Sequence, residues 1–433
     1  MVVVFAVVLI VVVALLAGVH RYLWRRFVGD TTAPGSALRR VGTVAAFVLP
    51  LLSIGALVSG QAGAPFWLQQ VLAWPGYLWL ACLLYLTLAL LVGEAVRPLL
   101  RRALDRRRPE RAAPAGGTTA AGRTSVGAPA EERAGALVPA GAPVRTTPAA
   151  VSEAPTAAAT SRRVFVARAV GGAAAVAGFG TVGYGTYGVL RGPRTKRITV
   201  PLAKLPRSAH GFRIAVVSDI HLGPILGHAH TRRVVDAVNA TRPDLIAVVG
   251  DLVDGSVADL GHAAEPLADL EARYGSFFVT GNHEYFSGAA EWVDHVRELG
   301  LHPLENARVE IDGFDLAGVN DVAGESEGQG PDFDRALGDR DPARAAVLMA
   351  HQPVVIDDAV AHGVDLQLSG HTHGGQLWPG NLVAELANPT VAGLERYGDT
   401  QLYVSRGAGA WGPPVRVGAP SDITVVELAS RQA

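Results

Sequence analysis

Residues 244–254 read DLIAVVGDLVD, and this stretch decides the fold of the second half of the chain. A short apolar run rich in β-branched residues is typical of a buried strand, and here it ends on Gly250 and Asp251. The same succession of a short apolar run and a polar cluster recurs after residue 198. Six further runs are expected strands, residues 213–218, 276–280, 345–350, 365–369, 402–405 and 423–428, and residues 231–240 and 289–299 have helical spacing. Strands and helices in alternation predict an α/β layered domain.

Five polar clusters follow the expected strands. Open α/β sheets collect ligands at the carboxyl ends of their strands, so these side chains are expected to meet. Each cluster alone would more often be a turn, and a lone histidine would more often be structural; five clusters in a consistent position predict a site. Oxygen and imidazole donors without sulfur suit Mn, Fe, Zn or Co. The clusters are Asp219-Ile220-His221, Gly250-Asp251-Leu252-Val253-Asp254, Gly281-Asn282-His283-Glu284, His351 and Gly370-His371-Thr372-His373.

In this order, D-x-H, G-D-x-x-D, G-N-H-E, a lone H and G-H-x-H, the clusters resemble the signature of the calcineurin-like metallophosphoesterases. Residues 281–285, 369–376 and 406–414 look more narrowly like the membrane-attached, exported bacterial branch of that family. The resemblance implies two sheets flanked by helices over residues 197–433. It also implies a phosphoester hydrolase that uses two divalent metal ions.

The resemblance assigns a role to every position of the pattern. Asp251 would bridge the two ions, and a carboxylate suits that role because it offers one oxygen to each of two cations about 3.5–4 Å apart. One ion would be held by Asp219, His221, Asp251 and His373, and the other by Asp251, Asn282, His351 and His371.

His283 is not in the implied ligand set. Beside Asn282, it is placed to stabilise developing charge or to protonate the leaving oxygen. Glu284 is expected to orient the His283 ring, with a helix-capping role as the alternative. Asp254 is expected to support a ligand from outside the ligand set.

Residues near the C-terminus offer contacts for a substrate. Arg406 and Arg416 flank a loop of glycine, proline and tryptophan, and each would either grip a substrate phosphate or form an ordinary surface ion pair. Trp378, Leu382 and Trp411 would either form an apolar wall beside the metals or fill the core.

Composition excludes several classes of protein. Only 18% of the 433 residues are charged and 49% are hydrophobic, more apolar than one soluble domain needs, which indicates a membrane. The net charge of −1 argues against a general nucleic-acid binder. Cys82 is the only cysteine, so an intramolecular disulfide and a thiolate metal cluster are both excluded.

Three apolar runs, residues 2–19, 41–59 and 74–93, are long enough to cross a bilayer. The first lacks a preceding positive charge, which disfavours a cleaved signal peptide. Arginines fall between the first and second runs and after the third, which places both segments in the cytoplasm and the uncharged residues 60–73 outside. Residues 1–111 are thus predicted to form a membrane region with basic cytoplasmic flanks.

Residues 112–160 are dominated by Ala, Pro, Gly and Thr without apolar periodicity, so a flexible linker is expected. Ser161-Arg162-Arg163 then precedes a mildly apolar, glycine-rich stretch. Residues 161–190 resemble a twin-arginine export signal, which implies the twin-arginine machinery as a partner; the alternative is a fourth membrane helix. Either reading places the C-terminal domain on the extracytoplasmic side of the cell membrane.

The leading hypothesis is a membrane-anchored phosphoesterase acting on a diester, monoester or pyrophosphate, with a lipid-linked or envelope-linked phosphate favoured by the membrane placement. A metal-binding scaffold or sensor is the alternative, and the intact set of ligand positions counts against it. A transporter is disfavoured because ionisable residues are almost confined to the ends of the apolar runs.

Overall fold

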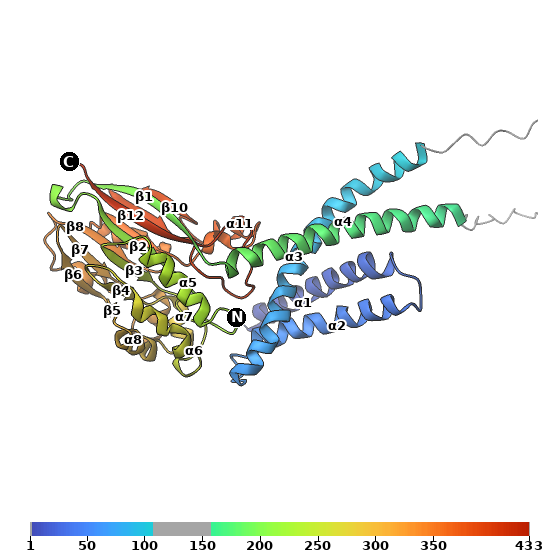
Figure 1. Ribbon diagram of the computed structural model, residues 1–433, viewed down its shortest axis with the longest axis horizontal. Helices are drawn as coiled ribbons and strands as arrows, with labels where there is room; N and C mark the ends of the chain where they lie inside the picture. The colour runs from blue at the N-terminus through green and yellow to red at the C-terminus, as the bar shows by residue number, and fades with distance from the viewer. Residues whose placement is uncertain (1, 107–156, 433) are drawn as a thin grey trace, which may run out of the picture.

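The computed structural model describes residues 2–106 and 157–432 and divides them into a helical region and an α/β domain (Figure 1). Residues 112–156 of the predicted linker lie outside the described residues. Among the described residues, four helices are long and apolar enough, by length and composition, to cross a membrane. This confirms the predicted class of the N-terminal region. The helices are α1 Val2–Trp24, continued by a π-helical turn over Arg25–Gly29, then α2 Ala37–Val58, α3 Phe66–Arg106 and α4 Ala157–Leu190.

The helices extend beyond the apolar runs that predicted them. Helix α3 has 41 residues, and at 1.5 Å per residue it is about 60 Å long, twice the thickness of a hydrocarbon core. Its last turns contain Arg97, Arg101, Arg102 and Arg106, because arginine is a good helix former although it is polar. Hydropathy therefore located the apolar part of each helix and missed its ends.

The α/β domain contains two six-stranded sheets. The first has the order β1-β12-β2-β3-β4-β5 and the second the order β10-β11-β9-β8-β7-β6. The strands of the first sheet are β1 Arg194–Leu202, β2 Phe212–Val217, β3 Leu245–Val249, β4 Ser276–Val279, β5 His302–Pro303 and β12 Asp422–Ser430. Those of the second are β6 Ala307–Ile311, β7 Phe314–Gly318, β8 Ala345–Met349, β9 Leu366–Ser369, β10 Gly393–Tyr397 and β11 Thr400–Val404.

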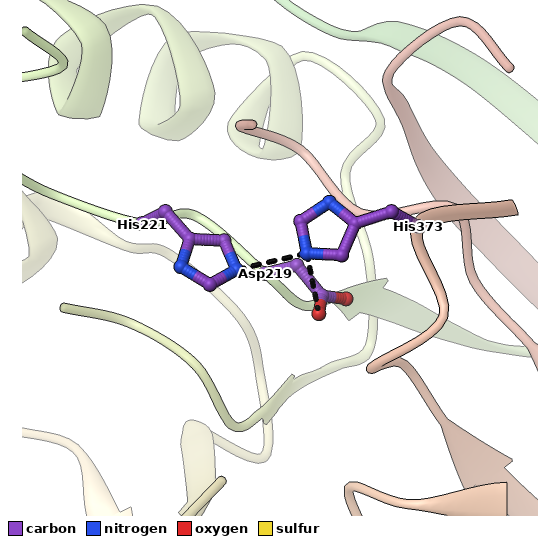
Figure 2. A group of neighbouring side chains, drawn as sticks. All are labelled: Asp219, His221 and His373. Atoms are coloured by element: carbon purple, nitrogen blue, oxygen red, sulfur yellow. Dashed lines mark hydrogen bonds and ion pairs between the residues drawn. The ribbon is translucent and has the colours of Figure 1, made fainter. Parts of the chain in front are cut away.

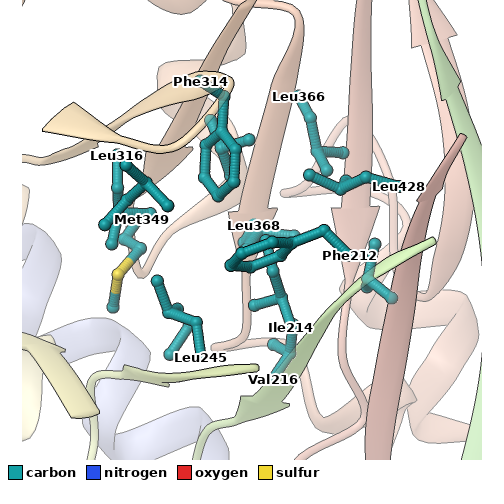
Figure 3. Packing of buried hydrophobic residues seen from close by; sticks show 14 of the residues in the cluster. Phe212, Ile214, Val216, Leu245, Phe314, Leu316, Met349, Leu366, Leu368 and Leu428 are labelled. Carbon is teal, nitrogen blue, oxygen red and sulfur yellow. The ribbon is translucent and has the colours of Figure 1, made fainter. Parts of the chain in front are cut away.

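The main apolar core lies between the two sheets (Figure 3). Strand β2 shows why: Phe212, Ile214 and Val216 face the second sheet, while Ala215 and Val217 face the helices, as expected from the two-residue period of a strand. From the second sheet, residues such as Leu316 and Leu366 complete this core. The domain is therefore a sandwich of two sheets, as predicted.

Helices cover the outer face of each sheet. Val234 and Trp292 pack on the first sheet, and Phe333 and Ile356 pack on the second. The resulting order of layers is helices, sheet, sheet, helices. The helices of the first outer layer are α5 His228–Asn239, α6 Val257–Ala264 and α8 Ala289–Glu298, those of the second are α9 Phe333–Leu337 and α10 Ile356–Ala361, and the short helices α7 Asn282–Ser287 and α11 Gly380–Ala384 follow β4 and β9.

The helical region contacts the domain directly. The Tyr85 hydroxyl of α3 donates a hydrogen bond to the Trp378 carbonyl oxygen at 2.9 Å. Val415 of the domain is buried among α3 and α4 residues such as Leu86 and Val182. A Cβ on Gly185 of α4 would lie 2.7 Å from a Val415 methyl carbon, so glycine permits this close approach. These contacts lie beside the loops that carry the candidate site.

Candidate metal centre

All seven predicted metal ligands lie at one edge of the sandwich, because strands β2, β3 and β4 run parallel in one sheet and β8, β9 and β11 run parallel in the other. Their carboxyl ends therefore present the following loops together. The residues are Asp219 and His221 after β2, Asp251 after β3, Asn282 at the start of α7 after β4, His351 after β8, and His371 and His373 after β9.

Asp219, His221 and His373 form the first donor cluster (Figure 2). The Nε2 atoms of His221 and His373 are 2.9 Å apart, and His373 Nε2 lies 3.4 Å from Asp219 Oδ1. All three residues are buried. Two imidazoles and a carboxylate that converge in this way offer the nitrogen and oxygen donors that borderline divalent metals prefer.

Asp251, His351 and His371 form the second donor cluster. Asp251 Oδ2 lies 3.1 Å from His351 Nε2 and 3.7 Å from His221 Nε2 of the first cluster. His371 Nδ1 lies 2.9 Å from Asn282 Oδ1. Asp251 thus lies between histidines of both clusters, as a bridging carboxylate would.

Two of the histidines are oriented by their second ring nitrogen. His351 Nδ1 lies 2.9 Å from the Val249 carbonyl oxygen, to which only an N–H can donate. His221 Nδ1 lies 2.8 Å from Asp254 Oδ1, a carboxylate oxygen that also accepts a hydrogen bond from an N–H. When Nδ1 carries the hydrogen in a neutral imidazole, Nε2 has a free lone pair. His351 Nε2 then faces Asp251, and His221 Nε2 faces His373 and, at a longer distance, Asp251.

The backbone at the site adopts a conformation that side chains rarely accept. Asp219, His221, Asp251, His371 and His373 have φ values of 50°, 49°, 52°, 71° and 53°. A non-glycine residue at positive φ costs about 1–2 kcal/mol. Five of the seven predicted ligands share this strain, and such strain is concentrated at functional sites.

Glycine is also required beside the ligands. Gly250 has a φ of 72°, and a Cβ there would lie 2.7 Å from both the Gly281 nitrogen and His351 Nδ1. Such contacts are too close for any side chain, so the residue before Asp251 must be glycine.

The charges of the cluster fit divalent cations. Burial lowers the pKa of His221, but the carboxylates of Asp254, Asp251 and Asp219 outweigh it and raise that pKa to about 9. Burial and the neighbouring His351 lower the pKa of His371 to about 4. The carboxylates thus favour positive charge in the cluster. His221 can take up that charge as a proton, whereas His371 cannot. Divalent metal ions would supply positive charge next to both histidines.

His283 lies beside the first cluster and is oriented by Asp254. His283 Nδ1 is 2.7 Å from Asp254 Oδ1, the same oxygen that contacts His221 Nδ1. The two rings meet edge to face, with centroids 4.7 Å apart. One carboxylate therefore orients both a predicted ligand and the predicted acid.

The expected pairing of Glu284 with His283 is wrong. Glu284 is buried, and its carboxylate accepts hydrogen bonds from the backbone nitrogens of Gly281, Asp251 and Leu252 at 2.6, 3.0 and 2.7 Å. At the third position of α7 it caps that helix, which was the alternative expectation. Three backbone donors occupy the carboxylate and turn it away from the His283 ring.

Comparisons with known proteins agree with this geometry. The family model described as calcineurin-like phosphoesterase matches residues 212–375. A transmembrane protein with metallophosphoesterase domain from Danio rerio is 37% identical over 259 residues, which cover 57% of this chain and 59% of that protein. An uncharacterized metallophosphoesterase from Aquifex aeolicus is 34% identical over 240 residues, covering 54% of this chain and 91% of that protein. The chain belongs to the calcineurin-like metallophosphoesterase family.

The metallophosphoesterase has relatives in animals and in bacteria, including an uncharacterized metallophosphoesterase of Helicobacter pylori that is 37% identical over 247 residues, 56% of this chain and 66% of that protein. The narrower resemblance to an exported bacterial branch therefore stays a prediction. The match spans 59% of the length of the Danio rerio relative.

Arg416 of the metallophosphoesterase is buried and bound to the protein itself. Its Nη1 donates to the His373 and Ala419 carbonyl oxygens at 3.0 and 3.3 Å, and its Nε donates to the Gly409 carbonyl oxygen at 2.7 Å. Its Nη2 lies 2.9 Å from His373 Nδ1. Burial lowers the pKa of Arg416 to about 10. These contacts contradict both earlier expectations, phosphate contact and a surface ion pair, because the donors point inward.

Arg406 is half-buried beside Gly374, where a Cβ would lie 3.0 Å from Arg406 Cγ. Its contact with a substrate phosphate stays a prediction. The apolar residues expected as wall or core are exposed at the surface: Trp378 by 54%, Trp411 by 56% and Leu382 by 56%. They are therefore not core filler.

Proposed function

We propose that this chain is a metal-dependent phosphoesterase with two divalent ions, held by Asp219, His221, Asp251 and His373 and by Asp251, Asn282, His351 and His371. The observation that carries the proposal is the position of Asp251 Oδ2, 3.1 Å from His351 Nε2 and 3.7 Å from His221 Nε2. One carboxylate shared between two sets of nitrogen and oxygen donors is the arrangement that a binuclear hydrolytic site needs. Mn, Fe, Zn and Co all suit this donor set.

When bound, the two ions would lower the pKa of a water molecule and neutralise phosphoryl oxygens. In the reaction, a water oxygen forms a bond to phosphorus while the bond from phosphorus to the ester oxygen breaks. Asp254 holds His283 through Nδ1, which leaves Nε2 of His283 to donate a proton to the departing oxygen. Arg416 holds the His373 loop by donating to the His373 carbonyl oxygen, and is a positioning residue.

We also propose that the helical region anchors the enzyme in the cell membrane with the α/β domain on the extracytoplasmic side. Residues 1–111 and 161–190 would supply four spans, and residues 112–160, of which the last four begin α4, a cytoplasmic linker. The arginines around the α1–α2 connection, the end of α3 and the start of α4 gather at the end of the helical region away from the domain (Figure 1). Positive charge marks the cytoplasmic side. Arg162 and Arg163 lie at the start of α4, so export by the twin-arginine machinery and a fourth span share this topology.

The test is hydrolysis by the full chain in lipid nanodiscs. We expect release of nitrophenolate from nitrophenyl phosphate or bis(nitrophenyl) phosphate with Mn, Fe, Zn or Co, and loss of this activity with a chelator. His351→Ala should abolish it. His262→Ala is the matched control, because the His262 side chain is 77% exposed and lies outside the cluster. Absence of hydrolysis of both esters with all four metals would contradict the proposal.

A further inference from the structure

A cavity of about 1010 Å³ connects the candidate metal centre to the membrane helices. On the domain side it is lined by His221, Asp254 and His283. On the helical side it is lined by Leu57 of α2 and by Tyr77 and Leu80 of α3, with the short α2–α3 connection between them. Its volume is at the upper end of the roughly 300–1,000 Å³ of small-molecule sites. A phosphoryl group alone would leave most of it empty.

The chemistry of the lining changes along the cavity. His221, Asp254 and His283 line it at the edge of the metal centre, while Leu57, Tyr77 and Leu80, together with the amides of Gln61 and Gln69, line the side of the two apolar helices. A ligand that matched this lining would carry a phosphate at one end and a hydrocarbon chain at the other. Burying such a chain against apolar side chains is favourable in proportion to its length.

Exposed aromatic rings line the cavity beside His283. Phe286 and Trp411 flank His283, with ring centroids 5.6 and 5.7 Å from the His283 ring, and they are 75% and 56% exposed. Large aromatic side chains left exposed beside a reactive group are typical of a ligand contact. The first groups of a substrate beyond its phosphate would pass between these rings.

The loop that carries Trp411 is held in place by Gln376. Gln376 Nε2 donates to the Trp411 and Pro413 carbonyl oxygens at 2.9 and 3.1 Å, and Gln376 Oε1 accepts from the Trp411 nitrogen at 3.0 Å. On the helical side, the Tyr77 hydroxyl donates to the Ala56 carbonyl oxygen at 3.2 Å. Hydrogen bonds therefore hold the Trp411 loop on one side of the cavity and join α2 to α3 on the other.

We propose that the substrate is an amphiphilic phosphoester, whose phosphate lies at the metal centre and whose alkyl chain lies in the cavity against the α2–α3 end of the helical region. The proposal rests on the proposed phosphoesterase function and assigns its substrate class. Because the cavity is bounded by the membrane helices themselves, a lipid could enter it from the adjoining leaflet without leaving the bilayer entirely.

The first test compares methyl and octyl nitrophenyl phosphodiesters with the metal-loaded full chain in nanodiscs, below micelle-forming concentrations. Water attacks phosphorus, the bond to the nitrophenyl oxygen breaks, and nitrophenolate and the alkyl phosphate are released. We expect kcat/KM to be at least tenfold higher for the octyl ester, since each buried methylene favours binding. Equal kcat/KM values would overturn the substrate class and leave the phosphoesterase proposal standing.

A pair of variants distinguishes the cavity from simple partition into lipid. Ala62 and Ala64 lie in the same α2–α3 connection, but only Ala64 lines the cavity. Ala64→Trp should fill the cavity and lower the octyl-to-methyl ratio at least fivefold. Ala62→Trp is the matched control and should leave the ratio unchanged. An unchanged ratio in Ala64→Trp, or an equal fall in both variants, would contradict the proposed chain position.

A binding measurement does not depend on turnover. A decyl phosphate with a diazirine at the far end of its chain should label residues 56–80 on irradiation, and excess octyl phosphate should suppress the labelling. Decyl alcohol with the same diazirine measures labelling from the bilayer. Suppressible labelling without hydrolysis of either ester would contradict the phosphoesterase function and support the lipid cavity. Labelling that octyl phosphate does not suppress would overturn the cavity proposal.

Discussion

His283 Nδ1 lies 2.7 Å from Asp254 Oδ1, and this contact joins the predicted proton donor to a carboxylate that also holds His221. The oxygen lies between two imidazoles, one predicted to bind metal and one predicted to act on the leaving group. Asp254 therefore links the integrity of the metal centre to the orientation of the acid.

Asp254→Asn should lower kcat by about 10–100-fold, the usual effect of removing a carboxylate that orients a metal ligand. The amide keeps the side-chain shape but loses the charge that both rings contact. KM should change less than kcat, because the substrate phosphate is held elsewhere. Steady-state kinetics with the metal-loaded chain measures both.

Glu284→Gln should instead lower the melting temperature of the domain. The Glu284 carboxylate accepts three backbone hydrogen bonds, and the amide group of glutamine would place donors against donors. We expect a loss of about 1–3 kcal/mol of stability, the cost of a buried unsatisfied polar group. Thermal unfolding followed by tryptophan fluorescence measures it. If Glu284→Gln left the stability unchanged and lowered kcat as much as Asp254→Asn does, Glu284 would have to be the residue that orients His283.

The contrast between these two carboxylates shows what the sequence could and could not predict. Each ligand position follows an apolar run, so strand pattern and motif order predicted the whole cluster that the structure brings together. Whether Asp254 or Glu284 reaches the ring of His283 depends on how the loop after β3 folds against α7. From the sequence, Glu284 was expected to contact His283 because it is the next residue, but the contact is made by Asp254, 29 positions earlier.

The second sheet was predicted incompletely for a different reason. Strand β7 is buried throughout, but Asp315 interrupts its apolar pattern. Arg344 Nε lies 2.9 Å from Asp315 Oδ1 and compensates the buried charge. Pairing between residues 29 positions apart is not visible in a local pattern. The cavity beside Leu57 and Leu80 was also beyond prediction, because it arises from packing of helices against the domain.

The proton donor role of His283 makes a prediction about leaving groups. His283→Ala should retain about two metal ions while losing activity by about 10²–10⁴-fold toward esters with poor leaving groups. The loss should be smaller for a nitrophenyl ester, because that oxygen needs less protonation as the bond breaks. Equal losses for both kinds of ester would show that His283 stabilises charge and does not donate a proton. Loss of one metal ion would show that His283 is a metal ligand.

His230 should make the domain sensitive to acid. It is buried with both ring nitrogens unpartnered among the described contacts, and burial, with Arg233 and Arg416 nearby, lowers its pKa to about 3. Below pH 6.5 the unfolded chain gains a proton that the folded chain does not, so stability falls by up to about 1.4 kcal/mol per pH unit between pH 6.5 and 3.

His230→Leu should therefore lose less stability than the unaltered chain as the pH falls from 7 to 4. Melting temperatures of the two proteins across this range provide the measurement, with the exposed His262→Leu as a control. Parallel curves for the His230→Leu and unaltered chains would show that His230 accepts its proton while folded.

The charge distribution of the helical region predicts the side on which the domain lies. A reporter enzyme that works only outside the cytoplasm should be active when fused after residue 433, since the helix ends that carry the arginines lie away from the domain (Figure 1). A reporter inserted in residues 112–156 should show the reverse. If a C-terminal fusion to a reporter that works only in the cytoplasm were active, the α/β domain would lie on the cytoplasmic side and the predicted topology would be wrong.

Metal analysis of Asp251→Asn tests the central claim, a binuclear centre with one shared carboxylate, most directly. The unaltered chain should contain two equivalents of divalent metal, and Asp251→Asn should lose occupancy at both positions, because the bridging charge is removed from each. His221→Ala, which removes a ligand from one cluster only, should retain about one equivalent. Two equivalents per chain in the Asp251→Asn protein would contradict the shared carboxylate.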